Sequence, residues 1–378
     1  MESAPEREAK MHVTVVERAP TAIREFEEDE LAGKLTSQDV EVIREIFNTP
    51  LVGSYNWDYE AANAKIRKLY ELGKRFNWDA MADVDWDVDY PLSEPPSDPA
   101  LNAFAGHPKY EALTQEQKMD FAWRGHAQTL SQFLHGEQGA LMVASQLVSC
   151  APTYDAKLYA ASQTFDEARH VEVFNRYLRQ RCHMIYPINP NLKFLLDKVL
   201  SDPRWDLKFI GMQILIEGLA LAAFQSMAMT ARDPLIRQIV ELVMRDEGRH
   251  VAFGVNYLED WIKALPQPEI DARAQFAYEA CVIMRERLFS TDVAEEFGFT
   301  AEEAKEIQVG GAVGRAFRDF LFERMIPNLK RVGLLTEAVR PKFEALGVLK
   351  WEDAAHDGLI DWATLEKPLP VKAVLAAE

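Results

Sequence analysis

The chain has 378 residues, long enough for one large domain or two smaller ones, and its 48% hydrophobic and 27% charged residues are ordinary for a soluble globular protein. The formal net charge of −18 argues against nucleic acid or an anionic membrane surface as a partner, because both would repel the protein. Three scattered cysteines and the lack of an apolar signal sequence lead us to expect a reducing, cytoplasmic location.

Residues 1–110 are predicted to form an N-terminal extension that is partly helical and partly irregular. An amphipathic helix is expected over 59–76, and the Trp, Asp and Pro residues of 77–110 indicate an ordered but irregular wrap. We find no motif in this extension that indicates chemistry.

Residues 111–265 carry the start and stop signals of a bundle of four long helices. Thr114-x-x-Gln117 is a capping box that begins the first helix, while Asp202-Pro203 and Asp233-Pro234 are predicted to begin the third and the fourth. The helices are expected from 115 to about 149, from the break at 152–153 to about 183, from 203 to a turn near 232, and from 234 to about 265, with a short extra helix over 192–200.

The most apolar stretch of the chain, 212–229, lies in the third of these helices. It contains two Gln and one Glu and falls short of a clean membrane span of about 20 residues. A helix that is apolar nearly all round is typical of a protein interior, so we expect this one to be buried and not to cross a membrane.

Residues 266–378 are predicted to form further helices that pack on the bundle, followed by a surface tail. The helices are expected over 271–289, 300–307, 313–325 and 336–346, and the tail from 368 onward.

Six residues of the bundle form a pattern that repeats after 80 positions. The two copies are Glu137, Glu167 and His170, and then Glu217, Glu247 and His250. Two copies of Glu…Glu-x-x-His are the ligand set of a carboxylate-bridged two-iron site inside a four-helix bundle.

The predicted turns agree with this pattern. Glu137 and Glu167 are equidistant from residue 152, and Glu217 and Glu247 from residue 232, where the two turns are expected. In an antiparallel helix pair, residues equidistant from the turn lie at the same height, here about 22 Å from it. Each pair of carboxylates is therefore expected to be level within its hairpin.

The spacing within each copy suits a metal. Glu167 and His170 are three residues apart on one helix, as are Glu247 and His250, so each pair can meet one ion. A single Glu-x-x-His is more often a solvated pair, but the doubled pattern favours metal binding. Four carboxylates offset two divalent ions, and one imidazole per ion leaves positions open for O2.

Two aspartates and two arginines flank the histidines in both copies. Asp166 and Asp246 each lie four residues before a histidine, where a carboxylate can accept the free imidazole N–H and fix its tautomer. Arg169 and Arg249 are expected to neutralise these aspartates. Surface ion pairs are the alternative interpretation of the four residues.

With Asp-Glu-x-Arg-His in both halves, the chain resembles the ferritin-like di-iron carboxylate superfamily. The resemblance is to its O2-activating branch of bacterial hydroxylases, N-oxygenases and soluble desaturases, and it covers about residues 114–260. It implies an all-α, ferritin-like four-helix bundle with additional N- and C-terminal helices. It also implies that the six residues bind two iron ions, between which O2 is reduced. A manganese/iron pair would take the same ligands.

Several positions depart from named branches of that superfamily. Ribonucleotide reductase small subunits carry a radical tyrosine where this chain has Phe174, and ligand-binding oxidases crosslink a Val and a Tyr at the positions of Gly139 and Met212. The p-aminobenzoate N-oxygenases add a third His where this chain has Val243. Hydroxylases and desaturases place a Thr at the position of Ala220 or Leu221. No named branch is matched at every position.

Residues one turn from the proposed ligands are expected to line an apolar substrate pocket, with core packing as the alternative role. They are Phe133, Ala140, Leu141, Phe174, Ala220, Leu221 and Phe224. His126, three turns from Glu137, is predicted to be an ordinary core or surface histidine.

The leading hypothesis is a di-iron oxygenase that hydroxylates or N-oxygenates a small, largely apolar organic molecule. The alternatives are a desaturase or oxidase, a ribonucleotide reductase-like subunit, and a ferroxidase or iron-storage protein. Electrons are expected from a separate ferredoxin or reductase, since the chain has no Gly-x-Gly-x-x-Gly loop and no cysteine cluster. A homodimer is the default for this architecture.

Overall fold

The protein is built almost entirely from helices, as the computed structural model shows for residues 24–25, 45, 47–49, 51–60 and 63–358. The one pair of strands in these ranges has two residues each, β1 (Arg24–Glu25) antiparallel to β2 (Met184–Ile185). The all-α prediction is confirmed. Much of the predicted N-terminal extension and the predicted tail from 368 onward lie outside the described residues.

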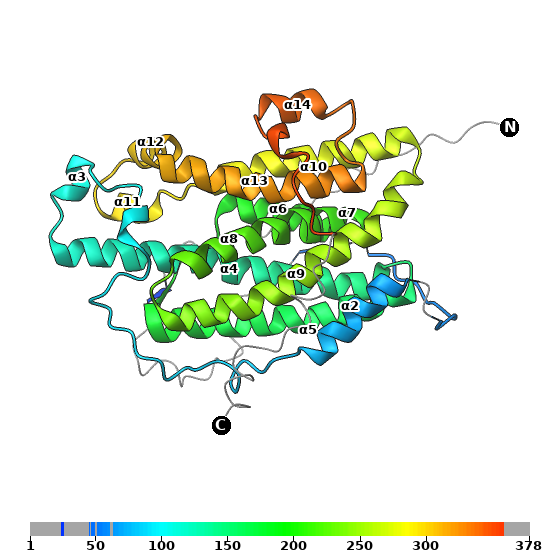
Figure 1. Ribbon diagram of the computed structural model, residues 1–378, viewed down its shortest axis with the longest axis horizontal. Helices are drawn as coiled ribbons and strands as arrows, with labels where there is room; N and C mark the ends of the chain where they lie inside the picture. The colour runs from blue at the N-terminus through cyan, green and yellow to red at the C-terminus, as the bar shows by residue number, and fades with distance from the viewer. Residues whose placement is uncertain (1–23, 26–44, 46, 50, 61–62, 359–378) are drawn as a thin grey trace.

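Four long helical segments run side by side along the longest axis of the molecule (Figure 1). They are α4 (Gln115–Cys150), α5 (Tyr154–Tyr177), the continuous run of α7 (Trp205–Phe209), η4 (Ile210–Ile216) and α8 (Glu217–Thr230), and α9 (Pro234–Lys263). Both turns fall where the ligand spacing required them, at 151–153 and 231–233. The η4 segment is π-helical and ends directly before Glu217.

Local signals explain where most of these helices begin and end. Thr114 and Gln117 form the predicted capping box, and Asp233 caps α9 with Pro234 in its first turn. The prediction for Asp202 is wrong. Its backbone ends α6 (Pro190–Ser201) as the C-cap, and the third helix begins three residues later, because the crossover helix takes up that residue.

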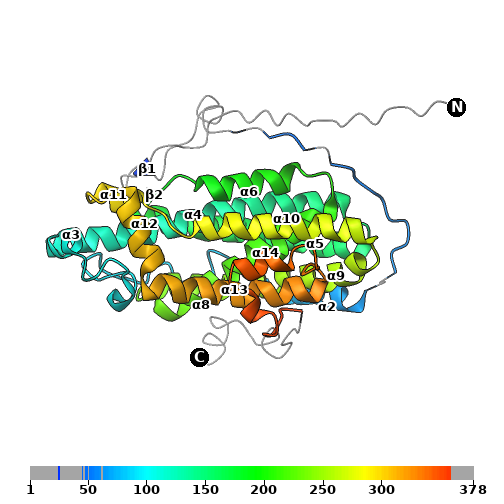
Figure 2. The ribbon, with the colours of Figure 1, turned by 90° about the horizontal axis from the view of Figure 1, so that it is seen from above.

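The remaining helices surround the bundle. Before it come α2 (Ala64–Arg75), η2 (Pro99–Leu101) and α3 (Pro108–Glu111), η3 (Leu178–Cys182) extends α5, and after the bundle come α10 (Gln267–Arg287), α11 (Asp292–Glu296), α12 (Ala301–Gly310), α13 (Ala312–Val332), α14 (Arg340–Ala345) and η5 (Leu349–Trp351). Figure 2 shows α10 between α6 and α13 in the view from above, and α2 contacts α5 and α9. The extra helices thus cover faces of the bundle.

The core consists of two apolar clusters inside and around the bundle. In the described part of the chain, Trp205–Thr230 is the one helical run long and apolar enough to cross a membrane, and 94% of its most apolar window is buried inside the protein. Burial of this kind is expected of a core helix, because the neighbouring helices take the place of lipid around its apolar faces.

Candidate metal centre

The six side chains of the repeated pattern meet in the middle of the bundle, and none is more than 5% exposed. α4 carries Glu137, α8 begins with Glu217, and α5 and α9 each carry one Glu-x-x-His pair. Because the four segments are antiparallel neighbours, equal distances from the turns bring these residues to one height.

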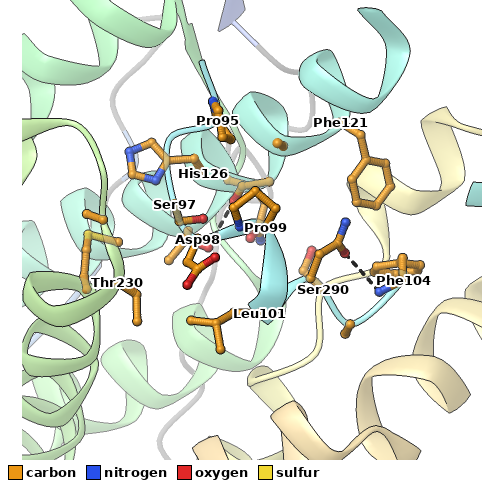
Figure 3. Close-up of a pocket in the computed structure, with 18 of the residues that line it drawn as sticks. Pro95, Ser97, Asp98, Pro99, Leu101, Phe104, Phe121, His126, Thr230 and Ser290 are labelled. Carbon is orange, nitrogen blue, oxygen red and sulfur yellow. Dashed lines mark hydrogen bonds between the residues drawn. The ribbon is translucent and has the colours of Figure 1, made fainter. Parts of the chain in front are cut away.

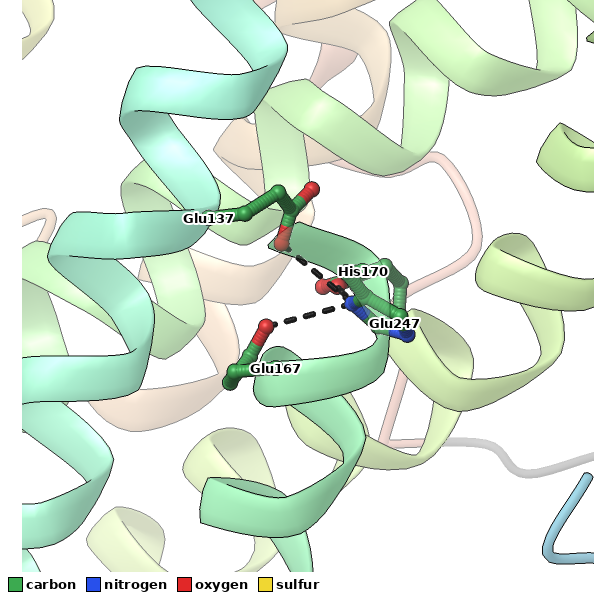
Figure 4. Close-up of side chains that lie close together, drawn as sticks. All are labelled: Glu137, Glu167, His170 and Glu247. Carbon is green, nitrogen blue, oxygen red and sulfur yellow. Dashed lines mark hydrogen bonds and ion pairs between the residues drawn. The ribbon is translucent and has the colours of Figure 1, made fainter. Parts of the chain in front are cut away.

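The first group of ligand atoms surrounds His170 (Figure 4). Its Nδ1 lies 3.3 Å from Glu137 Oε2, 3.2 Å from Glu167 Oε2 and 3.2 Å from Glu247 Oε1. One ligand atom from each of these four residues lies within 4.8 Å of all the others. The group draws on α4, α5 and α9.

The second group consists of Glu167, Glu217 and His250, again with ligand atoms within 4.8 Å of one another. His250 Nδ1 lies 3.1 Å from Glu167 Oε1 and 3.6 Å from Glu247 Oε2. Glu167 therefore belongs to both groups, and the two oxygens of Glu247 face different histidines. These two carboxylates lie between the two histidines, while Glu137 belongs to the group of His170 and Glu217 to that of His250.

The buried carboxylates strongly perturb one another. Burial and the nearby Glu247 raise the pKa of Glu137 well above its usual range, and burial with Glu247 and Glu167 does the same to the pKa of Glu217. Burial also acts against the charged form of His170, but the surrounding carboxylates outweigh it and raise the pKa of this imidazole well above its usual value. These shifts indicate that the centre needs positive charge, from protons or from cations, to balance its carboxylates.

Two observations test whether this centre suits two divalent ions. Among the described residues, Glu217 Oε2, both oxygens of Glu247 and His250 Nδ1 are buried and make no hydrogen bond. Buried polar atoms are normally paired, so such atoms are available as ligands. Charge gives the second observation. Four glutamates and two aspartates meet two arginines here, which leaves four negative charges with neutral histidines, matching two divalent cations. The residues fit the metal pair.

The aspartates hold the histidines in a crossed arrangement. His170 Nε2 lies 3.2 Å from Asp246 Oδ2, and His250 Nε2 lies 3.1 Å from Asp166 Oδ2. The predicted pairing within one helix is wrong, because the approach of α5 to α9 brings each aspartate closer to the histidine of the other helix. Each contact leaves Nδ1 facing the glutamates and so fixes the tautomer of a ligand.

The arginines complete this layer between the two helices. Arg169 Nη2 donates to Asp166 Oδ1 at 2.6 Å and to Asp246 Oδ2 at 2.9 Å, while Arg249 binds Asp246 and, at 3.4 Å, Asp166. All four side chains are buried. They form a ring of ion pairs in the interior, and the alternative interpretation as surface ion pairs is wrong.

Sequence reasoning missed two residues that hold the centre. Trp78 Nε1 donates to Asp246 Oδ2 at 2.7 Å, and nothing in the sequence links these positions, which are 168 residues apart. Gln163 Nε2 donates to Glu167 Oε1 at 3.0 Å and to Glu217 Oε1 at 2.8 Å. Gln163 lies one turn before Glu167 on the same helix face, and that spacing was a signal available in the sequence.

The π-helical segment η4 packs closely against α9. A Cβ at Gly254 on α9 would lie 2.6 Å from the Cβ of Gln213, so the two segments approach as closely as only glycine permits. Gln213 in turn points at Gln163, with Nε2 3.4 Å from its Oε1. The π-helical turn thus adds a further amide beside Gln163, which itself donates to two glutamates.

The predicted pocket residues divide into two sets. Phe133 lines a cavity of about 910 Å³, and its ring packs 5.9 Å from Phe174 and 4.7 Å from Phe224, which are both fully buried. The residues that do not line that cavity are Ala140, Leu141, Phe174, Ala220, Leu221 and Phe224. On α8, Leu219 and Ala223 face the cavity instead.

The helical bundle and the two overlapping Glu/His groups define a ferritin-like di-iron carboxylate protein. Within that class, the chain belongs to the p-aminobenzoate N-oxygenase AurF family, whose model matches residues 59–333. Val243, fully buried in an apolar cluster, remains a departure from the expected third histidine of those enzymes. Membership of the family therefore does not depend on that residue.

The chain is also similar to solved structures of an R2-like ligand-binding oxidase. An aerobically reconstituted Mn/Fe form is 17% identical, with a TM-score of 0.45, over 74% of this chain and 95% of that one. A variant with an anaerobically reconstituted Mn/Fe cofactor is 18% identical, with a TM-score of 0.47, over 74% and 96%. A comparison with curated proteins gave no match.

Proposed function

We propose that this protein is a non-haem di-iron oxygenase that activates O2 and N-oxygenates a small organic amine, with hydroxylation as the second reaction type. The observation that carries the proposal is the pair of buried ligand groups that share Glu167. The family description favours N-oxygenation over hydroxylation and desaturation.

The six residues of the repeat would hold the metal pair, with Glu137 and His170 on one side and Glu217 and His250 on the other. Glu167 and Glu247 would bridge. When bound, two iron ions supply the redox chemistry that reduces O2 and transfers one of its atoms to the substrate. A manganese/iron pair would use the same ligands.

The surrounding side chains of the chain would keep this centre in place. Asp246 and Asp166 hold the Nε2 side of the two imidazoles, so that Nδ1 of each is directed at the glutamates. Gln163 donates to one bridging and one outer glutamate and so fixes their oxygens. The buried rings of Phe174 and Phe224 exclude water from one side.

The electrons, the assembly and the location are further parts of the proposal. A separate ferredoxin or reductase would deliver two electrons, since the three described cysteines are scattered and buried. We propose a homodimer and a cytoplasmic location on general grounds, the architecture for the first and the cysteine content for the second.

The test is to load the protein anaerobically with Fe(II), count the bound iron, and mix it with O2 in a stopped-flow spectrometer. We expect about two irons per chain and a transient absorption band that decays faster when an aromatic amine is added. Conversion to ferric product with continued iron uptake would instead identify a ferroxidase. A chain that binds no iron would overturn the proposal.

A further inference from the structure

A large cavity lies along α4, with His126 and Phe121 of that helix on its wall (Figure 3). It has a volume of about 910 Å³ and is bounded by α4, α8 and the irregular segment before α3. Its lining on α4 runs from Gln115 to Phe133, and 18 residues at 1.5 Å each span about 27 Å. A cavity of this length suits an elongated molecule.

Phe133 marks the end of the α4 lining that is nearest to the metal centre. The residue lies one turn before Glu137 on α4, lines the cavity, and packs against the buried ring of Phe174. Phe174 itself lies one turn beyond His170. A molecule in the cavity would therefore present its inner end to the metal centre beside Phe133.

The lining offers no free positive charge to an anion. Lys118 is the one Lys or Arg on the wall, and its Nζ is 2.6 Å from Glu111 Oε2. The other charged lining residues are two acids at the mouth, Glu94 and Asp98, of which Asp98 lies 3.6 Å from the exposed Arg232. Burying a carboxylate without a cation is costly, so the wall disfavours an anionic substrate.

His126 lines the cavity, and its contacts fix the tautomer in which Nδ1 is a hydrogen-bond acceptor. Tyr177 Oη donates to Asp233 Oδ2 at 2.8 Å, and this carboxylate also faces Arg181 Nε at 3.2 Å. Because the phenol proton is used there, the contact of 3.2 Å between His126 Nε2 and Tyr177 Oη requires an Nε2–H donor. Nδ1 is then unprotonated, and no partner for it exists among the described residues.

Burial keeps this arrangement neutral. It lowers the pKa of His126 to about 4 and raises the pKa of the Tyr177 phenol well above its usual value. The imidazole therefore accepts a hydrogen bond from a ligand and does not supply the positive charge that the wall lacks.

We propose that this cavity is the substrate chamber and that it selects an elongated, uncharged molecule whose distal hydroxyl or amino group donates to His126 Nδ1. The inference rests on the proposed function only in calling the bound molecule the substrate. His126 and Phe133 are seven residues apart on α4, so the donor group and the inner end of the molecule are separated by about 10 Å. The aminobenzoate anion named for the family is shorter and carries the disfavoured charge.

Three para-aminobiphenyl probes test the proposal, one each with hydroxyl, methoxy and carboxylate at the far para position. Their affinities for the Fe(II)-loaded full chain are measured anaerobically by equilibrium dialysis. We expect the hydroxyl probe to bind about fivefold more tightly than the methoxy probe, which cannot donate, and more than about tenfold more tightly than the carboxylate.

Two variants separate recognition from folding. Tyr177→Phe removes the acceptor that fixes the tautomer of His126, so the preference for hydroxyl over methoxy should fall to nearly one, whereas a purely structural role would weaken both probes equally. Thr129→Arg adds a cation to the cavity wall and should raise the affinity for the carboxylate by about tenfold. Tyr278→Phe, on α10 outside the cavity, is the matched control and should change no affinity.

The outcomes distinguish this inference from the proposed function. If the carboxylate binds as tightly as the hydroxyl probe, or if none of the probes binds, the chamber is wrong even when iron loading and O2 consumption are normal. If the probes bind in the expected order to a protein that consumes no O2, the proposed oxygenase is wrong and the selectivity of the cavity stands.

Discussion

The two helical hairpins of the bundle, α4–α5 and α8–α9, carry the same ligand pattern in different surroundings. Each supplies two glutamates, one histidine, one aspartate and one arginine to the centre. α4 contributes more residues than α8 to the lining of a long cavity, whereas η4 contributes none and is buried throughout. The first hairpin therefore faces the cavity along much of its first helix, whereas the second follows a fully enclosed segment.

The supporting contacts of the two halves differ as well. Trp78 stacks on His170 at 6.3 Å and donates to Asp246, while Tyr159 lies edge-on to His250 at 6.4 Å with a hydroxyl that makes no hydrogen bond among the described residues. The 80-residue repeat therefore specifies the metal ligands, but not the residues that contact the two histidines from outside. Four predictions follow this contrast from the largest expected effect to the smallest.

Glu167→Ala should remove both irons, because Glu167 belongs to both ligand groups. Glu217→Ala removes a residue of one group and should leave about one iron per chain. Iron is counted after anaerobic loading and desalting, with circular dichroism as the check on folding. Retention of one tight iron in Glu167→Ala would contradict the bridging position.

Asp246→Asn should weaken the metal held by His170 by about 10- to 100-fold, because the crossed contact orients that imidazole. The measurement is competition with a chelator for the single iron of Glu217→Ala, in which the His170 group is intact. Asp166→Asn in the same background is the control and should have a smaller effect, since Asp166 contacts His250. The reverse order would mean that each aspartate serves its own helix.

Trp78→Phe should lower the free energy of unfolding by about 1.5–3 kcal/mol, the usual contribution of a hydrogen bond to a charged group. The ring remains beside His170, so the loss is confined to the bond with Asp246. Urea denaturation at constant metal loading gives the value. An unchanged midpoint would show that the indole N–H contributes nothing to stability.

Tyr159→Phe should change the free energy of unfolding by less than about 1 kcal/mol and in the stabilising direction, because the buried hydroxyl of Tyr159 makes no hydrogen bond among the described residues. The same denaturation experiment compares it directly with Trp78→Phe. A loss as large as that of the tryptophan variant would reveal a partner for the hydroxyl and make the two halves equivalent.

Much of the fold followed from local chemistry in the sequence. The Thr114 capping box, the Asp233-Pro234 start and the level glutamates were all predicted, because each depends on residues close together in the chain. The π-helical η4 was not, since the mostly apolar run from 210 to 216 carries no sign of an added residue.

The site was predictable only in part for a related reason. The repeat identified the six converging side chains, but the pairing of each aspartate depends on the approach of α5 to α9, which spacing along one helix does not contain. Trp78 reaches Asp246 across 168 residues. The cavity lies along α4 and meets the expected pocket only at Phe133, because the rings of Phe174 and Phe224 fill the space one turn from the ligands.

The crossed aspartates also have a consequence for the order of folding. The contacts of His170 with Asp246 and of His250 with Asp166 join positions 76 and 84 residues apart, so neither hairpin completes its half of the centre alone. Contacts of long sequence separation form late, after the loops between them have closed. We therefore expect the two hairpins to form first and to dock before either imidazole is oriented, so that the metals enter a bundle that is already assembled.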